Sequence, residues 1–330
     1  MKKLLLIYIV ANILSCGSKH EKYKLEEISI NNAGLKSLKN NLEYNNRMKL
    51  LLINNEFHIY NLGKNNILYD INLSEGNFTS SILNISVPSV AVNYEADTIS
   101  VVTKDSFFKY TTKGVLLDKY CVTMPGQNFV IHPMYFEALH KFNNFYYYQI
   151  GHSQNYNYVD SSILFFFNKD TAFIVFNYPE EYSSYYIHYN EVCMASSSDD
   201  FFIVPTLVSS ILKANISTGN EVRNKIQNIK FKRFDTTKLN DVLYISKYTE
   251  ETNYIVKVLA SKKHIFIIQR NPKSSNKVFT HAIHIYTHDL KRIDELLIEI
   301  PINENLTEVI NDQLILVNDL KTKVYKYNFQ

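Results

Sequence analysis

Residues 254–300 read YIVKVLASKKHIFIIQRNPKSSNKVFTHAIHIYTHDLKRIDELLIEI and set the expectation for the whole chain. Four runs of apolar, β-branched or aromatic residues lie within this stretch, at 254–260, 264–270, 281–289 and 296–300. Each run has the length of a strand, and polar segments separate the runs. Few apolar positions recur with the 3.6-residue period of a helix. The stretch therefore predicts four consecutive antiparallel strands.

The same pattern recurs along the chain in units of roughly 50 residues. Its second run is found at residues 50–54, 98–103, 145–150, 201–206, 264–270 and 313–319. Repeated units of four antiparallel strands are typical of a β-propeller, in which each sheet is a blade that packs between its neighbours. The sequence thus predicts an all-β fold, a six-bladed β-propeller with four-stranded antiparallel blades. Two β-sandwiches are the alternative, but they would not explain six units.

The last unit lacks an outer strand, because the sequence reaches residue 330 after the run at 323–329. An unpaired edge strand would favour association with other chains. Residues 23–30 are strand-like and have no other place in the repeat, so we expect them to close the ring by pairing in the last blade. Their apolar positions change phase at Glu26 and Glu27, which predicts a β-bulge. Residues 35–46 are expected to form the inner strand of the first blade.

The N-terminus carries a targeting signal. Lys2 and Lys3 precede an apolar run at 4–14, which is shorter than the ~20 residues that a transmembrane helix needs. The run ends in ILSC at 13–16, which resembles the lipobox of bacterial lipoproteins, where cleavage before the cysteine precedes lipidation. The alternative is an ordinary secretory signal in which Cys16 is incidental. The predicted organisation is a signal peptide at 1–15, lipidated Cys16 with a short tether at 16–22, and a single propeller domain at 23–330.

The lipobox and the repeated units together resemble the six-bladed β-propeller lipoproteins of unknown function that are common in the Bacteroidota. This resemblance implies a protein of the cell envelope that is anchored to a membrane through the lipid on Cys16. Gly17 follows the cysteine in place of the Asp that would favour retention at the inner membrane, so the outer membrane is expected, with the protein facing the periplasm or the cell surface. The tether at 17–22 reaches about 20 Å at most, which keeps the propeller close to its membrane.

Charge, cysteines and motifs narrow the classes of function. The chain has 35 Lys and Arg against 32 Asp and Glu, so it has no basic excess for nucleic acid. Beyond Cys16 only Cys121 and Cys193 remain, and we expect buried free thiols in preference to a disulfide. The sequence contains no P-loop, dinucleotide glycine pattern, calcium loop or nucleophile elbow. It therefore predicts no cofactor, and it favours a non-catalytic protein while leaving an enzyme open.

Three histidines of the stretch quoted first, His281, His284 and His288, would share one face of a helix. On a strand His281 and His284 point to opposite faces of the sheet, and His284 lies about 13 Å from His288. The sequence therefore predicts no metal site here.

Nearly all long connections follow the second or fourth strand of a unit, and in a propeller these turns share the face around the channel mouth. Long loops in a compact domain are commonly functional. Tyr offers a flat apolar ring and a hydroxyl that suit sugars, peptides and protein partners. The candidate ligand-binding residues on these loops are His132, Tyr135, His152, Tyr156, Tyr158, Tyr185 and His188, and His140 belongs to the first loop.

The sequence accordingly predicts a membrane-anchored binding or scaffold module that uses its long-loop face to hold a glycan, a peptide or an envelope protein. One alternative is an enzyme of the hydrolase or lyase class with its site at the mouth of the central channel. Another is a component of an envelope transport or assembly complex, for which an exposed apolar edge or patch would be the sign.

Overall fold

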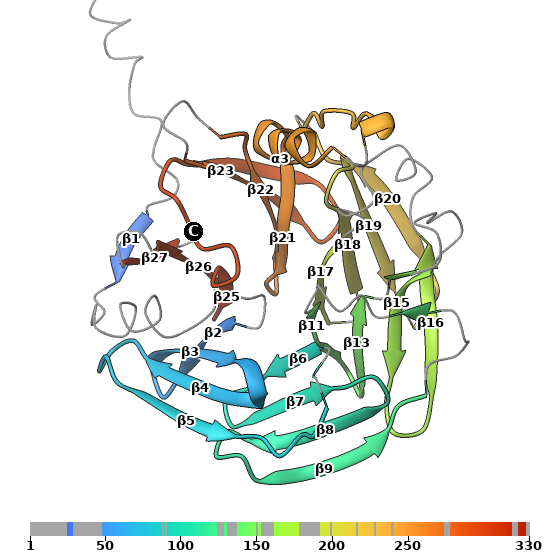
Figure 1. Ribbon diagram of the computed structural model, residues 1–330. Helices are drawn as coiled ribbons and strands as arrows, with labels where there is room; N and C mark the ends of the chain where they lie inside the picture. The colour runs from blue at the N-terminus through green and yellow to red at the C-terminus, as the bar shows by residue number, and fades with distance from the viewer. Residues whose placement is uncertain are drawn as a thin grey trace, which may run out of the picture.

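The computed structural model describes residues 25–28, 48–87, 89, 91–123, 129–130, 137–149, 151–152, 162–177, 192–198, 200–215, 217–227, 229–238, 241–273, 278–318 and 323–327. In this part of the chain nearly all regular structure is β-strand, in small sheets arranged around a central axis (Figure 1). One edge strand of each sheet lies near the axis, and the remaining strands follow outward. The predicted all-β propeller is confirmed.

Five of the sheets are four-stranded and antiparallel. From the centre outward they are β2 (Met48–Ile53), β3 (Glu56–Leu62), β4 (Ile67–Asn72) and β5 (Phe78–Ile82); β12 (His140–Phe142), β13 (Phe145–Gln149), β15 (Ser162–Phe167) and β16 (Ala172–Asn177); β17 (Val192–Ser197), β18 (Asp200–Pro205), β19 (Ser210–Asn215) and β20 (Glu221–Lys225); β21 (Tyr254–Ala260), β22 (His264–Arg270), β23 (His281–Thr287) and β24 (Arg292–Ile298); and β25 (Glu308–Ile310), β26 (Gln313–Asn318), β27 (Lys323–Tyr327) and β1 (Leu25–Ile28).

A further sheet departs from the predicted four strands. Its strands β6 (Ala91–Tyr94), β7 (Thr98–Val102), β8 (Ser106–Thr111) and β9 (Leu116–Cys121) repeat the antiparallel meander, but β11 (Glu137–Ala138) pairs parallel to β6 as a fifth strand. The expectation of six equal four-stranded blades is wrong here, because β11, which belongs to the connection between β9 and β12, lies beside β6 and occupies backbone groups that would otherwise be free. The same connection contains β10 (Phe129–Val130), which pairs with β14 (Gly151–His152).

The first sheet is shifted by one strand from its predicted assignment. The run that we expected to be its second strand is β2, the edge strand nearest the axis. Its fourth strand is β5, whose sequence FTSSI is mostly exposed and gives no apolar signal. Residues 35–46, the predicted inner strand, lie outside the described residues.

The N-terminal strand pairs in the last sheet, as the sequence predicts. β1 lies antiparallel to β27, from Leu25 opposite Tyr327 to Ile28 opposite Val324. This register is continuous, so the β-bulge predicted at Glu26 and Glu27 is wrong. Ile28 packs against the core while Glu27 is exposed, and an outermost strand of four residues reaches this arrangement without an extra residue.

The core lies between neighbouring sheets and is rich in aromatic rings. Phe201 contacts three rings of the adjacent sheet, with centroid distances of 4.2 Å to Phe142, 4.9 Å to Tyr147 and 5.3 Å to Phe166. The last and first sheets share a similar cluster, in which Ile315 and Val317 pack with Met48 and Leu50. Burial on both faces of a sheet explains why these strands lack an alternating pattern.

One long connection, between β20 and β21, folds into a short 3-10 turn, η4 (Thr236–Lys238), and a helix, α3 (Val242–Glu251). The sequence predicted only a loop at this position. None of the helices in the described part of the chain combines the length and the apolarity needed to cross a membrane.

Candidate functional site

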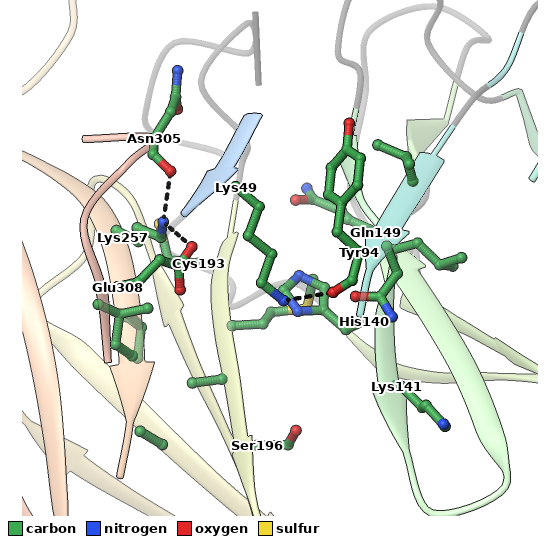
Figure 2. A pocket seen from close by; sticks show the side chains of 18 of the residues that line it. Lys49, Tyr94, His140, Lys141, Gln149, Cys193, Ser196, Lys257, Asn305 and Glu308 are labelled. Atoms are coloured by element: carbon green, nitrogen blue, oxygen red, sulfur yellow. Dashed lines mark hydrogen bonds and ion pairs between the residues drawn. The ribbon is translucent and has the colours of Figure 1, made fainter. Parts of the chain in front are cut away.

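Strands β2, β6, β12, β17, β21 and β25, each the first strand of its antiparallel meander, surround a cavity of about 520 Å³. This volume lies in the range of pockets that hold small organic ligands. Each of the six strands contributes polar or charged residues to the lining, between apolar ones such as Met48, Val258 and Leu259. Figure 2 shows the side chains that line it. Inner strands from sheets far apart in the sequence therefore build one site.

Several of the charged residues lie where the inner strands begin. Lys49 is the second residue of β2, His140 is the first residue of β12, and Glu308 is the first residue of β25. An inner strand begins where a connection from an outer strand returns to the axis, which is the class of connection that is long in this chain. The backbone of these three residues therefore lies toward the channel end at which these connections enter.

Lys257 is held on one side of the cavity by two acceptors. Its Nζ donates to the backbone oxygen of Asn305 at 3.1 Å and forms an ion pair with Glu308 Oε1 at 2.9 Å (Figure 2). The Lys257 and Glu308 side chains are 21% and 15% exposed. Since both groups are mostly removed from water, their interaction is screened less than that of a surface pair.

Lys49 has a weaker set of contacts. Its Nζ reaches the backbone oxygen of Tyr94 at 3.5 Å, which is long for a hydrogen bond to an ammonium group (Figure 2). Among the residues that the structure describes, no carboxylate lies within ion-pair distance of Lys49. The half-buried ammonium group therefore presents donors to the cavity that no carboxylate of the described ranges neutralises.

His140 lies beside these lysines and stacks on Tyr147, with ring centroids 5.0 Å apart and planes 17° from parallel. Burial, in the first place, and the positive charges of Lys49 and Lys257 together lower the pKa of His140 to about 3. The imidazole is therefore neutral at physiological pH.

The opposite part of the cavity holds a second ion pair. Lys141 Nζ lies 2.9 Å from Glu95 Oε1, and Lys109 Nζ lies 3.7 Å from the other oxygen of the same carboxylate. Burial opposes ionisation of Glu95, but hydrogen bonds from Lys141 and Thr98 outweigh it and hold the pKa of Glu95 below its usual value. This carboxylate is therefore charged and already paired.

A charge balance follows from the lining residues. The three lysines that line the cavity, Lys49, Lys141 and Lys257, carry a charge of +3, and Glu95 and Glu308 carry −2. With His140 neutral, the described lining has a net charge of +1, which corresponds to Lys49.

Most of the binding residues predicted from the sequence lie outside the described residues, together with Cys16: they are His132, Tyr135, Tyr156, Tyr158, Tyr185 and His188. The backbone of His152 is described and pairs with Phe129 in β14 and β10. His140, assigned to a loop from the sequence, is in β12 instead. The structure therefore leaves the predicted loop site untested and identifies a neighbouring site in the channel.

Lys49, Lys257 and Glu308 were not predicted from the sequence. A usable signal was present for the lysines, because each interrupts an apolar run that forms an inner strand, MKLLLI for Lys49 and YIVKVLA for Lys257. A lysine in such a run faces the channel when its strand is the innermost of a sheet. No comparable signal marks Glu308, since β25 has only three residues.

The three histidines of β23 and its following turn have separate partners. His281 Nε2 lies 2.8 Å from Glu304, His284 Nε2 lies 3.0 Å from the side-chain oxygen of Gln269, and His288 Nε2 lies 3.0 Å from the backbone oxygen of Ser261. Within the described ranges, no three metal-ligating side chains converge.

Cys121 and Cys193 form no disulfide in the described part of the chain, as expected. The expectation that both are buried is wrong: Cys121 is exposed because it ends an outer strand, β9, and Cys193 is half-buried.

Comparisons with known proteins support the fold. No family model matches the chain, and no curated protein matches it. Among solved structures, a Bacteroides fragilis protein described as exported is 12% identical, with 94% of this chain and 96% of that chain covered and a TM-score of 0.52. Regucalcin from Agrobacterium tumefaciens, a calcium-binding protein, is 12% identical over 83% and 86% of the two chains, with a TM-score of 0.46. A luciferin-regenerating enzyme is 8% identical over 92% and 94%, with a TM-score of 0.48. The similarity to the Bacteroides fragilis protein shows a shared propeller fold, and at this identity the fold alone.

Proposed function

We propose that this protein is a lipid-anchored binding module of the cell envelope, and that its propeller holds a ligand at the channel end where the long connections enter. The observation that carries this proposal is the cavity of about 520 Å³ into which inner strands of separate sheets project polar side chains. Sites of this kind, concave and apolar with a few convergent polar groups, are the usual place for a small ligand.

The proposed molecule is a closed ring of six blades, in which the sheet of β6 to β9 counts as one blade. Two observations support closure: β1 pairs with β27 in the last sheet, and the last and first sheets share a core cluster. In this organisation residues 1–15 are a signal peptide, 16–22 are the lipidated cysteine and its tether, and 23–330 are one domain. The Bacteroides fragilis protein of similar fold, described as exported, agrees with a place in the envelope.

The proposed ligand is a glycan, a peptide or a segment of an envelope protein. The candidate loop residues His132, Tyr135, His152, Tyr156, Tyr158, Tyr185 and His188 belong to connections that enter at the same channel end, so we propose that they extend the site beyond the cavity. Tyrosine rings suit this task because they offer a flat apolar face and a hydroxyl group.

Binding is favoured over catalysis by the state of His140. A general base works best when its pKa lies near the operating pH. The pKa of His140 is lowered to about 3 by burial and by the nearby lysines, which makes the imidazole a weak base. Glu95 and Glu308, the carboxylates that line the cavity, are each paired with a lysine.

The anchor and the binding role are tested separately. Cells that express the wild-type chain or Cys16→Ala are labelled with a fatty acid and fractionated; we expect label and outer-membrane recovery for the wild type and loss of both for the variant. Recovery of Cys16→Ala in the outer membrane with no label on the wild type would contradict the anchor.

Arrays of glycans and peptides then test binding, with the cavity variant Val258→Phe as the control that should abolish it.

A second candidate function is a subunit of an envelope assembly, and one specific observation favours it. The outer strands β5 and β9 and the turn before β9 expose a group of large apolar side chains: Phe78, Ile82, Val115, Leu116 and Leu117, of which Ile82 is 73% exposed. The turn at Gly114 lies against Ile82, so the two strands contribute to one patch. Patches of this kind mark sites of protein association.

Cross-linking tests this candidate. A photo-reactive residue at Leu117 should give one discrete cross-linked species in cells, while the same residue at Val222, an exposed apolar position on the outer strand of another sheet, should give none. Equal cross-linking at both positions, or none at Leu117, would reject the candidate.

A further inference from the structure

We infer that the central cavity recognises a carboxylate group on its ligand, and that the Lys49 ammonium group binds it. This inference rests on the proposed function, since it names the chemical group that the channel site would recognise. It concerns one atom of the cavity, Lys49 Nζ, and the space in front of it (Figure 2).

The first argument is the arrangement of charge. Each of the other two lysines that line the cavity has a carboxylate at 2.9 Å, Glu308 for Lys257 and Glu95 for Lys141. Lys49 has only a backbone oxygen at 3.5 Å among the described residues. A half-buried ammonium group costs free energy unless it is paired. An anion from the ligand would supply the missing partner.

The second argument is that the other charged groups of the cavity already have partners and that His140 carries no charge. Glu308 is occupied by Lys257, which in turn donates to the Asn305 oxygen. His140 is neutral, so it neither repels a bound cationic portion nor neutralises the carboxylate. Lys49 and Lys257, which add to the effect of burial in lowering the pKa of His140, contribute a positive potential that favours an anion at the same place.

The third argument concerns which anion fits. The described lining has an excess of one positive charge, which matches a monovalent group. Phosphate carries more charge, and proteins recognise it with arginine forks, backbone N–H groups or several lysines. No arginine is found among the described residues that line the cavity. A carboxylate is therefore the better match, carried by an acidic sugar or by the C-terminus of a short peptide, either of which fits a cavity of about 520 Å³.

Calorimetric titration of the full chain in detergent tests the inference, with two carboxylates and the matching compounds without a carboxylate as probes: glucuronate with glucose, and diglycine with diglycine amide. Each counterpart lacks the carboxylate, and the free amine of diglycine is kept in diglycine amide. We expect saturable binding of at least one carboxylate and weaker binding, by about tenfold, of its counterpart. Binding of glucuronate alone identifies an acidic sugar as the source of the carboxylate, and binding of diglycine alone identifies a peptide C-terminus.

Variants then assign the binding to Lys49. Lys49→Gln should weaken binding of the carboxylate by about tenfold or more, while Lys49→Arg, which keeps the charge, should retain most of it. Glu308→Gln releases Lys257 from its ion pair and should strengthen binding by a few-fold, about three to ten. A cavity that does not bind an anion would not produce that gain. Thermal unfolding of each variant shows that the fold is intact.

Three outcomes would overturn the inference. These are no saturable binding of glucuronate or diglycine at millimolar concentration; equal binding of each carboxylate and its counterpart without a carboxylate; and equal binding by the wild type and Lys49→Gln. A neutral glycan or peptide that binds independently of Lys49 would leave the proposed binding function in place and reject the carboxylate alone.

Discussion

Single residues set the electrostatics of the channel, and His140 shows how. Its ring lies beside two lysines that come from β2 and β21, strands of two other sheets. No local pattern around His140 contains this information, because the neighbours approach through the fold. The sequence placed His140 on a loop and could not indicate a lowered pKa. The lysines themselves were readable as charges within apolar runs, but their convergence depended on the ring.

The lowered pKa of His140 predicts how stability depends on pH. Its folded-state pKa, about 3, lies below the ordinary value of 6.5, so the unfolded chain binds the proton more readily. The contribution of His140 is present above pH 6.5 and is lost as the pH falls. We expect the free energy of unfolding to drop between pH 6.5 and 5 by at most about 1.4 kcal/mol per pH unit from this group.

Denaturant unfolding at pH 7, 6 and 5 measures this slope, with His140→Asn as the comparison. The variant should show a shallower slope and keep some of it, because the pKa values of His264 and His284 are also lowered, chiefly by burial. Glu95 contributes in a lower range, since its pKa lies below the ordinary 4.5. An unchanged slope in His140→Asn would mean that His140 titrates normally.

Two glycines offer a matched pair for testing the junction between β5 and the turn before β9. Gly114 and Gly219 both have positive φ, +81° and +69°. A Cβ at Gly114 would lie 2.8 Å from the backbone oxygen of Ile82, whereas a Cβ at Gly219 has nothing within 4 Å. In both alanine variants the left-handed backbone conformation costs about 1 kcal/mol of stability, and Gly114→Ala in addition displaces the neighbouring strand.

We therefore expect Gly114→Ala to lower the free energy of unfolding by about 1 to 2 kcal/mol more than Gly219→Ala does. Chemical denaturation of the two variants measures the difference. Equal losses would show that β5 and the turn are not in firm contact.

At the scale of elements, the strands were predictable and the helix was not. Strands such as β22 and β23 carry dense β-branched and aromatic runs that indicate them directly. The helix α3 was missed because it buries one narrow face, in which Tyr248 packs with Phe234 beside Tyr244 and Ile245. Val242 and Leu243 remain exposed, which blurs the 3.6-residue pattern. The parallel pairing of β11 with β6 was also missed, since a pair of two residues leaves no periodicity.

The start of α3 depends on one side chain. Asp241 is the N-cap, and its carboxylate accepts a hydrogen bond from the backbone N–H of Tyr244 at 3.0 Å. Asp241→Ala should destabilise the helix by about 1 kcal/mol, while Asp241→Asn should preserve most of the cap. Hydrogen exchange of the α3 amides is the appropriate measurement, because the helix can open without unfolding the sheets. Faster exchange in both variants, or in neither, would contradict the capping role.

At the scale of the whole molecule, the spacing of the repeated units was enough to predict a propeller and the use of the N-terminal strand in the last sheet. Residues 23–30 are strand-like but have no place in the repeat, and the last unit lacks an outer strand. The first could therefore supply the second, and β1 does pair with β27. The predicted four strands per blade failed only where a connection adds β11 to the sheet of β6. The site was less predictable, because the convergence of inner strands is a property of the assembled ring.

The pairing of β1 with β27 has a consequence for the whole molecule that can be tested at Ile28. This side chain packs against the cluster formed by Met48, Leu50 and Ile315 where the last sheet meets the first. Ile28→Asp places a charge against this cluster, and we expect β1 to detach, with a loss of about 2 to 3 kcal/mol in the free energy of unfolding. Glu27→Ala, at an exposed neighbouring position, should change stability by less than about 0.5 kcal/mol.

Detachment of β1 would also expose the backbone groups of β27 as a free edge, and a free edge pairs readily with another chain. Ile28→Asp should therefore form dimers or larger species at concentrations at which the wild type and Glu27→Ala share one smaller mass, as measured by light scattering after size exclusion. If Ile28→Asp were destabilised but kept the mass of the wild type, β27 would have another cover, and the N-terminal strand would contribute packing without protecting the edge.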